Sequence, residues 1–315
     1  MSASTGRPGS AKAAPVARPP DERRENRAGL AFVTPALVLI GVFFFLPVVA
    51  GMLLSLTDFD LYALGDLGAV RFVGLHNYAT LLASPEFWKA LANTFYFVLV
   101  GGPLSVALSL AAALLLNEKL VRFKGLFRTV YFAPVVTTLV AVAVVWRYLY
   151  HPRFGMLNQA LSLVGIAPID WLGNPRWAIP AIIVMAAWRS FGYNMVIFLA
   201  GLQAIPDSVY EAARLDGAGP LRRFWGITLP LLRPTMMFVA VMTMIGYFQL
   251  FAEPYVLTAG TGGPANATLT IVMLMYKEGF RWWNMGYAAA VAFVLFLVVL
   301  AATSLQLALQ RGGRE

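Results

Sequence analysis

Long stretches without charged residues recur along the whole chain and are separated by short polar segments. An apolar, almost uncharged stretch of about 18 or more residues is a candidate transmembrane helix. Six such stretches are present, at residues 29–57, 90–117, 129–146, 177–205, 234–255 and 282–310. The fourth contains one charged residue, Arg189, and the fifth contains Glu253 near its end. The pattern predicts an all-α, polytopic membrane protein with six transmembrane helices.

The composition agrees with a membrane protein. Hydrophobic residues make up 59% of the 315 residues and charged residues only 12%, against roughly 45–50% and about 25% in soluble globular proteins. These values exclude a soluble enzyme and a disordered protein. The chain has no cysteine, which excludes thiol catalysis, disulfides and cysteine-ligated metals. The net charge is +9, but no basic helix or aromatic RNA-binding motif accompanies it, so nucleic acid is not an expected partner.

The positions of the basic residues predict the orientation. Loops that are rich in Lys and Arg remain on the cytoplasmic side of a membrane. Most of the 24 Lys and Arg residues lie in the two terminal tails and in the loops after the second and fourth stretches. Both termini and the loop between spans four and five are therefore expected in the cytoplasm. Residues 1–28, rich in Ala, Pro, Arg and Ser, are expected to be a disordered cytoplasmic tail, and residues 311–315 a short C-terminal one.

The longest cytoplasmic loop, residues 205–230, carries the signals of two short helices within the membrane domain of residues 29–310. Pro206 suits a first helical turn. Gly217 suits the left-handed residue that ends a helix. Pro220 then opens a second helix, which Pro230 is expected to stop. The loop is thus predicted to be a helical hairpin at the membrane surface.

The first helix of this hairpin has a small apolar face. Ser208 and Glu211 have the spacing of a capping box. Val209, Ala212 and Ala213 share one face by helical spacing, and their small side chains would permit close approach of another surface. An interfacial helix whose basic neighbours meet anionic lipid is an equally open interpretation of these residues alone.

The hairpin sequence resembles the EAA loop of ABC importer permeases. Glu211-Ala212-Ala213 is followed after three residues by Gly217, and after nine more by Ile227-Thr228-Leu229-Pro230. This pattern has a fixed spacing and lies between spans four and five on the predicted cytoplasmic side, as in that family. The resemblance covers roughly residues 30–310.

Other segments resemble the carbohydrate-uptake branch of the family, similar to maltose and glycerol-phosphate permeases. They are Phe72 to Tyr78, Trp188 with Gly192-Tyr193-Asn194, Leu199 to Pro206, Phe251 to Thr258, and Gly262 to Thr268. Two differences are visible. Glu253 stands where the branch usually has Asp, and the stretch 259–261 has one residue more than usual.

The resemblance implies the fold, the partners and the coupling residues. It implies a type I ABC importer permease fold, and a carbohydrate that an extracytoplasmic solute-binding protein delivers. It also implies a second homologous permease subunit and two copies of an ABC ATPase. The chain has no Gly-x-x-x-x-Gly-Lys-Ser/Thr loop, so ATP and Mg²⁺ are expected on the ATPase subunits and no cofactor or metal on this chain, which is not expected to be an enzyme. The residues implied in ATPase coupling are Glu211, Ala212, Ala213, Asp216, Gly217, Ile227, Leu229 and Pro230.

A substrate path is predicted on spans four and five. Charged residues inside a membrane usually face the protein interior or water, and Arg189 lies about 16 residues, or roughly 24 Å, from the cytoplasmic loop. Helical spacing predicts that Met242, Gly246, Gln249 and Glu253 form one stripe. The candidate sugar contacts are Trp188, Arg189, Tyr193, Asn194, Gly246, Tyr247, Gln249 and Glu253. Pairing of Arg189 with Glu253, or with a partner span, is the alternative role for these charges.

Two other functional classes make different demands on the sequence. An ion-coupled secondary transporter would need inverted repeats, helices broken near the midplane and an ion site. An integral membrane enzyme would need acidic or histidine residues clustered near one interface. The sequence predicts neither arrangement, and His76 and His151 are expected to be ordinary loop residues. The expectation is a permease subunit of an ATP-driven carbohydrate importer, with an ion-coupled secondary transporter as the alternative.

Overall fold

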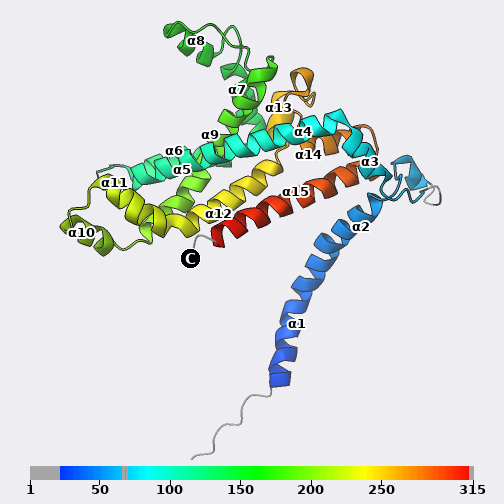
Figure 1. Ribbon diagram of the computed structural model, residues 1–315, viewed down its shortest axis with the longest axis horizontal. Helices are drawn as coiled ribbons and strands as arrows, with labels where there is room; N and C mark the ends of the chain where they lie inside the picture. The colour runs from blue at the N-terminus through cyan, green and yellow to red at the C-terminus, as the bar shows by residue number, and fades with distance from the viewer. Residues whose placement is uncertain (1–21, 66–67, 69, 119, 312–315) are drawn as a thin grey trace, which may run out of the picture. The chain divides into compact units, whose positions relative to one another are not determined.

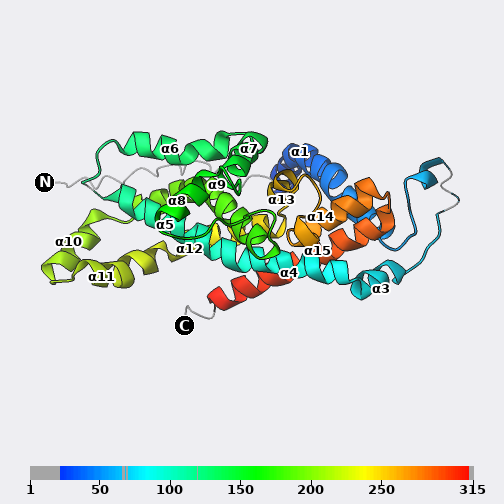
Figure 2. The same cartoon turned by 90° about the horizontal axis from the view of Figure 1, so that it is seen from above.

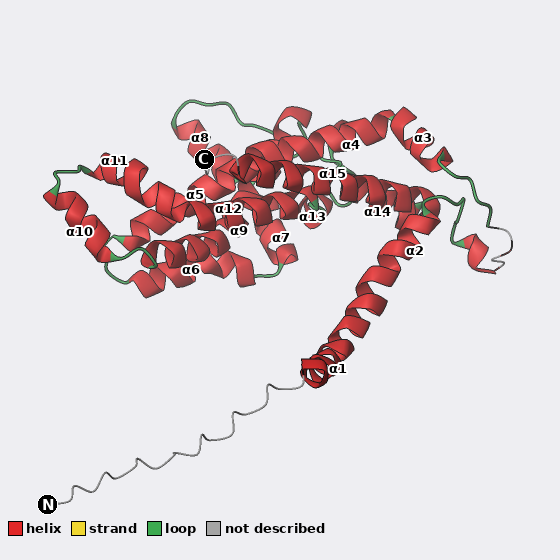
Figure 3. Ribbon diagram, turned by 60° about the horizontal axis from the view of Figure 1, so that its bottom comes forward, coloured by secondary structure: helices red, strands yellow, loops and turns green. Residues whose placement is uncertain are grey.

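The computed structural model describes residues 22–65, 68, 70–118 and 120–311. These residues are helical with connecting loops, and their one β-pairing is an isolated bridge between Thr57 and Phe72 (Figure 3). The chain divides into two compact units, residues 1–50 and 51–315, which are described separately below. The prediction of an all-α membrane protein is confirmed.

The first unit consists of an apolar helix. α1 (Glu22–Ile40), a π-helical turn (Gly41–Phe45) and the start of α2 (Leu46–Leu54) follow one another without a break. The stretch Gly29–Leu54 is long and apolar enough to cross a membrane, and none of its most apolar window is buried. Because α1 already begins at Glu22, the predicted disordered tail is helical over residues 22–28, where Glu, Arg and Ala favour helix. Residues 1–21 of that tail lie outside the described residues.

The second unit contains the remaining spans. Within the described residues, five helices of the whole chain are long and apolar enough to cross a membrane, or six if one bent pair counts as a single span. The continuous spans of this unit are α4 (Pro85–Tyr96) with its π-turn (Phe97–Gly101) and α5 (Gly102–Asn117), α9 (Pro175–Gln203), α12 (Leu229–Phe248) with the helical turns before it, and α15 (Met285–Arg311). Spans two, four and six lie where the apolar pattern predicted them.

The third predicted span is not one straight helix. It consists of α6 (Lys124–Val136) and α7 (Leu139–Leu149), which are bent by 99° relative to each other. Pro134 lies near the end of α6; it has no N–H to donate and restricts the residue before it. Thr137 and Thr138 then adopt extended conformations. The prediction of an unbroken span over residues 129–146 was therefore wrong, because an apolar pattern records length but not the local break.

The fifth predicted span is shifted toward the cytoplasmic loop. α11 (Pro220–Arg223), a π-turn (Phe224–Thr228) and α12 form one continuous helix, Pro220–Phe248. Pro230 lies in the first turn of α12 and does not stop the helix; the π-turn directly before it rearranges the hydrogen bonds where Pro230 lacks a donor.

At its other end, this helix stops earlier than predicted. α12 ends at Phe248, and Glu253 lies on a separate helix, α13 (Ala252–Leu257). The prediction that Met242, Gly246, Gln249 and Glu253 form one helical stripe was therefore wrong, although Met242 and Gly246 do lie on the same helix, α12. Its cause is the chain turn after Phe248, which interrupts the helical spacing.

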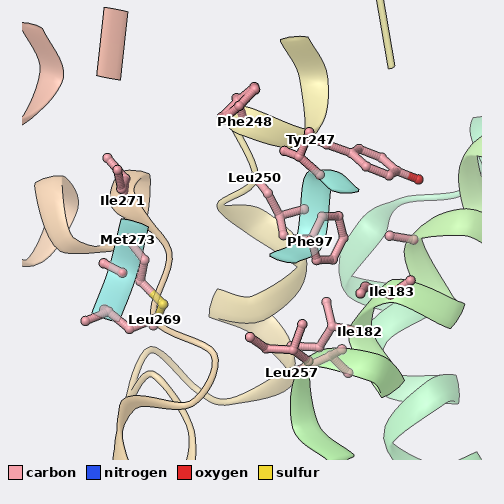
Figure 4. Close-up of a cluster of buried hydrophobic side chains, with 14 of the residues drawn as sticks. Phe97, Ile182, Ile183, Tyr247, Phe248, Leu250, Leu257, Leu269, Ile271 and Met273 are labelled. Carbon is pink, nitrogen blue, oxygen red and sulfur yellow. The ribbon is translucent and has the colours of Figure 1, made fainter. Parts of the chain in front are cut away.

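The buried core of the second unit lies between α4–α5, α9, α12 and α14 (Ile271–Tyr276). Figure 4 draws side chains of this core, among them the rings of Phe97 and Tyr247, which pack edge-on at 4.9 Å between their centroids. Gly101 allows close packing here, because a Cβ atom at this position would lie 3.1 Å from the Tyr247 ring.

Polar and short helical segments lie at the two ends of the second unit. α10 (Asp207–Leu215) and α11 lie at one end, and α3 (His76–Ala83) lies at the opposite end (Figures 1 and 2).

The loop before α3 is held by an ion pair of 2.9 Å between Asp58 and Arg71. The backbone N–H of Arg71 also donates to Asp58 and lowers the pKa of this carboxyl from its usual value. The other short helices are α8 (Met156–Leu163) and the turns Tyr62–Gly65, Pro264–Asn266 and Lys277–Arg281.

The contact between α6 and α9 depends on a glycine. A Cβ atom at Gly192 would overlap the backbone oxygen of Tyr131, whereas one at Gly246 would meet nothing within 4 Å. We expect Gly192→Ala to lower the free energy of unfolding by about 1–3 kcal/mol, because the two helices must separate. Gly246→Ala should leave stability unchanged or raise it by about 0.5–1 kcal/mol. Denaturation of the two purified variants measures the difference, and equal stabilities would contradict the close contact.

Candidate coupling and translocation sites

The end of α10 has the geometry that the sequence predicts for Gly217. This residue has a φ of +73°. The N–H of Ala218 donates to the Ala213 carbonyl at 2.8 Å, and the N–H of Gly217 donates to the Arg214 carbonyl at 3.0 Å. These two bonds are the Schellman motif, which needs a left-handed residue after the helix. The predicted conformation of Gly217 is confirmed.

The beginning of α10 differs from the prediction. Pro206 is the N-cap residue, and no side chain caps the helix. Ser208 thus lies inside the first turn, two positions after the cap, so the predicted capping box with Glu211 was wrong. Glu211 is exposed and makes no hydrogen bond or ion pair with the described residues. Its carboxylate is therefore available to another chain.

The small residues of α10 divide between two faces. Ala213 is buried and Val209 is half-buried, while Ala212 is exposed. The predicted common face of these three residues is therefore split, with Ala212 on the side of Glu211. Asp216 follows the helix as its C-cap and is exposed.

A side-chain hydrogen bond ties the two arms of the hairpin together. The hydroxyl groups of Tyr210 and Thr228 lie 3.1 Å apart, and Thr228 is buried. Its neighbours Ile227 and Leu229 are half-buried, and Pro230 is exposed. Sequence reasoning singled out the neighbours and missed Tyr210 and Thr228, because a bond between two loop arms leaves no periodic pattern.

Three exposed apolar side chains surround the hairpin and were also missed. Leu215 is 90% exposed, Leu221 is 75% exposed and Trp225 is 65% exposed. The hairpin therefore exposes large apolar side chains in addition to Glu211 and Ala212. Large apolar residues at the tip of a polar loop were the signal that could have identified this surface.

The two charged residues of the predicted substrate path bind each other. Arg189 on α9 donates from Nη1 to Oε1 of Glu253 on α13 at 2.9 Å. Their side chains are 32% and 13% exposed. The pairing considered as the alternative role is thus what the structure contains, and one side of the pair remains accessible.

Two other predicted substrate contacts are occupied in helix packing. Tyr247 shares a hydrogen bond of 3.0 Å with Ser190, which in turn bonds Ser105 at 2.9 Å. Asn194 donates to Thr243 at 3.1 Å in a buried position. These bonds connect α9 with α12 and α5, so both side chains hold the helices together.

The remaining candidates lie on exposed surfaces. Tyr193, Gly246 and Gln249 are exposed. Trp188 packs edge-on against Trp146 at 5.5 Å between ring centroids and lines an apolar cavity of about 700 Å³ between α5, α6, α7 and α9. Trp188 therefore belongs to a different face of α9 from Arg189.

Arg189 and Tyr193 share a face of α9 with Val196, at i, i+4 and i+7. Val196 lines an open cavity of about 690 Å³ whose other walls come from α6, including Ala133 and Thr137. The break between α6 and α7 begins at Thr137, so a bent helix forms one wall of this cavity. Sequence reasoning expected no broken helices and missed this feature.

Neither site has the constituents of a metal centre. In the described part of the chain, no group of three or more His, Cys, Asp or Glu side chains could hold a metal ion. The two sites can bind a partner surface and hydroxyl-rich or charged solutes by hydrogen bonds.

A polytopic bundle with an exposed hairpin between spans four and five and a polar face deep in span four defines a membrane permease. The chain belongs to the family described as the binding-protein-dependent transport system inner membrane component, which it matches over residues 30–314. Membership in this family decides against the ion-coupled secondary transporter, and it identifies a multi-pass inner membrane protein.

Similar proteins include curated permeases and a solved structure. The chain is 40% identical over 281 residues to the lactose transport system permease protein of Rhizobium radiobacter, covering 88% of this chain and 92% of that protein. It is 35% identical over 275 residues to the sn-glycerol-3-phosphate transport system permease protein of Agrobacterium fabrum, covering 87% and 91%. A chain of a bacterial ABC transporter involved in the import of the acidic polysaccharide alginate has the same fold, with a TM-score of 0.73, 23% identity, and coverage of 92% of this chain and 97% of that one. The predicted type I importer permease fold is thereby confirmed.

The left-handed turn at Gly217 is open to a direct test. A valine there would be strained by about 1–2 kcal/mol, whereas Gly219 has a φ of −67° and open space at its Cβ position. We expect Gly217→Val to increase amide hydrogen exchange in the hairpin at least tenfold, and Gly219→Val to leave it within twofold. Equal exchange in the two variants would show that the turn does not need a glycine.

Proposed function

We propose that this chain is one of two permease subunits of an ATP-driven importer. The importer moves a carbohydrate from an extracytoplasmic binding protein to the cytoplasm. The observation that carries this proposal is the hairpin, whose exposed Glu211, Ala212 and Leu215 form a surface for another chain at one end of the second unit. Two copies of an ABC ATPase, which bind ATP and Mg²⁺, are the proposed partners on that surface.

A second, homologous permease subunit completes the proposed assembly. The helix Gly29–Leu54 is long and apolar enough to cross a membrane, and its apolar side chains suit contact with lipid or with a second subunit. The Arg residues of the hairpin support a cytoplasmic position for this end of the second unit, because basic loops remain on the cytoplasmic side of a membrane. α15 runs toward the same end (Figure 1), so the C-terminus is proposed to be cytoplasmic. The six Lys and Arg residues among the first 27 residues support the same side for the N-terminus.

The continuous helix Pro220–Phe248 supports the coupling mechanism. ATP-driven closure of the ATPase pair would displace α10, and the Tyr210–Thr228 hydrogen bond passes this displacement to the helical turn before α12. Gly246 lies near the far end of the same helix. Movement at the hairpin would therefore change the walls of the substrate path without an intervening loop.

The relatives support a carbohydrate as the cargo. One is named for lactose and another for sn-glycerol-3-phosphate, so a sugar, an oligosaccharide or a glycerol-phosphate-like solute is proposed. One of these relatives is named for a neutral solute and the other for an anion, so family membership leaves the charge of the cargo open.

The coupling role of Glu211 can be tested in the assembled complex. We expect the binding protein, loaded with its sugar, to stimulate ATP hydrolysis, and Glu211→Ala to reduce that stimulation at least tenfold, because the carboxylate that faces the ATPase is lost. Glu118→Ala is the control: it removes another exposed cytoplasmic carboxylate, and the variant should retain the stimulation of ATP hydrolysis. Stimulation is measured in nanodiscs with both variants at equal expression.

Three outcomes separate the hypotheses. Equal stimulation in the two variants would remove Glu211 from the coupling surface. Absence of any co-purified ATPase would contradict the importer assignment. Binding of the hairpin to anionic vesicles in the absence of an ATPase would instead support the alternative hypothesis, in which α10 is an interfacial helix that contacts anionic lipid.

A further inference from the structure

The apolar cavity of about 700 Å³ beside Trp188 separates α5 from α6, while α9 packs against both helices. The α5 wall of this α5–α6 cavity is one helical face with the spacing i, i+4, i+7, i+8, i+11 and i+12. It consists of Leu104, Leu108, Ala111, Ala112, Leu115 and Leu116. The other walls carry aromatic side chains of α6, α7 and α9, namely Phe127, Tyr131, Trp146, Trp188 and Phe191. No charged side chain of the described residues lines the cavity.

The α5–α6 cavity is recessed between the helices and open to one side. Leu116, Trp146 and Ala187 line it in buried positions, whereas Leu108 and Leu115 are exposed. Side chains around an unfilled void lose the dispersion contacts that neighbouring atoms would supply. A hydrocarbon chain that enters between α5 and α6 would restore these contacts.

The length of the cavity matches one acyl chain of a lipid. Its α5 wall rises by about 18 Å from Leu104 to Leu116, and one leaflet contributes about 15 Å to the hydrocarbon core of a bilayer. One end of the cavity reaches Val121, in the loop after α5. The other end lies at Trp146 and Trp188, whose ring centroids are 5.5 Å apart. An acyl chain would therefore enter at the end of α5.

A lysine lies at this entrance. Lys124 shares a face of α6 with the lining residues Phe127 and Tyr131, at i, i+3 and i+7. Its Nζ donates to the carbonyl of Asn117, the last residue of α5, at 3.3 Å. This bond uses one of three N–H donors, and Lys124 forms no ion pair with the described residues. The nearby Glu118 side chain lines a different cavity, beneath the hairpin.

The other charges near the entrance are basic. Arg122 is exposed and follows Val121 in the loop, and Arg128 lines the cavity on the other side of α6. The loop after α5 lies at the same end of the second unit as the hairpin, because residues of both line one cavity. This end is proposed to be cytoplasmic. Basic groups between transmembrane helices on that side attract anionic lipid headgroups.

We propose that the α5–α6 cavity binds one acyl chain of an anionic phospholipid and that Lys124 binds the phosphate of its headgroup. The lipid fills the space that α5 and α6 leave between them. It remains on a different face of α9 from Arg189 and the predicted substrate path. The proposal goes beyond the proposed function and rests on it only for the leaflet from which the lipid comes.

Lipid retention by the assembled complex tests the apolar part of the site. The complex is reconstituted in nanodiscs of four parts phosphatidylcholine to one part phosphatidylglycerol, extracted in detergent and washed, and its retained phospholipid is measured by mass spectrometry. Ala111→Trp fills the middle of the cavity and should lower the retained phospholipid at least threefold. Ala141→Trp is the control: it places the same side chain at an exposed position of α7 outside the cavity and should leave retention unchanged. Equal retention in the two variants would overturn the proposal.

The headgroup preference tests the role of Lys124. We expect the phospholipid retained by the unmodified complex to contain at least fivefold more phosphatidylglycerol, relative to phosphatidylcholine, than the bilayer does. Lys124→Gln should lower this preference at least threefold, because the ammonium group is lost, and Lys124→Arg should keep it. An unchanged preference in Lys124→Gln would overturn the assignment of the headgroup to Lys124.

A photo-crosslinker at Leu115 identifies the occupant of the cavity directly. Benzoylphenylalanine replaces Leu115, which is exposed at the opening, and the adduct formed on illumination in the membrane is identified by its mass. A phospholipid adduct supports the proposal. An adduct with a second permease subunit, or with the first helix of this chain, would overturn it, because a protein segment would then fill the cavity.

Failure of this proposal can be distinguished from failure of the proposed function. Co-purified ATPase and its ATP hydrolysis are measured on the same samples. A complex that hydrolyses ATP, but whose retained phospholipid is unaffected by Ala111→Trp, contradicts only the lipid site. Phospholipid retention that Ala111→Trp abolishes, in a permease without any ATPase, would support the lipid site and contradict the importer.

Discussion

The bilayer imposes the constraint on which this structure depends. Inside hydrocarbon, every backbone N–H and C=O must find a partner within the protein, so each segment that enters the membrane is a helix or ends against polar groups of the same chain. At the end of α6, Thr137 donates both its backbone N–H, at 3.2 Å, and its hydroxyl, at 2.9 Å, to the Ala133 carbonyl. The same constraint explains why the turn after α12 is covered by Thr270, whose hydroxyl donates to the Leu250 carbonyl at 2.7 Å. The irregular backbone beside the substrate path is tolerated because neighbouring side chains satisfy it.

The apolar spans could be predicted well from the sequence, because the apolar character of a span is summed over a window of about 20 residues and single residues change it little. Prediction failed where one or two residues decide the outcome. Pro134 and Pro230 are both prolines in apolar stretches, yet the first precedes a 99° bend and the second lies in a continuous helix. The difference lies in the neighbouring backbone, a pair of extended threonines in one case and a π-turn in the other, and neither leaves a periodic signal.

The candidate sites were predictable to different degrees. Gly217 could be predicted from the sequence because a left-handed turn restricts residue type strongly. The pairing of Arg189 with Glu253 could only be left as an alternative, because the two residues lie on different helices and are 64 positions apart in the sequence. Asn194 and Tyr247 looked like sugar ligands by chemistry, but a polar side chain in a membrane bundle serves equally well as a bridge between helices. Which role it takes depends on what packs opposite it, and that is a property of the fold.

The unbroken helix from the hairpin to the substrate path also sets the scale of the movement. Its 29 residues correspond to a rod of about 43 Å. If such a rod pivots at one end by about 5°, its other end moves by about 4 Å, roughly the distance over which a hydrogen bond is made or lost. A small tilt imposed in the cytoplasm is thus sufficient to open or close contacts near the opposite side of the membrane, and no large rearrangement of the hairpin is required.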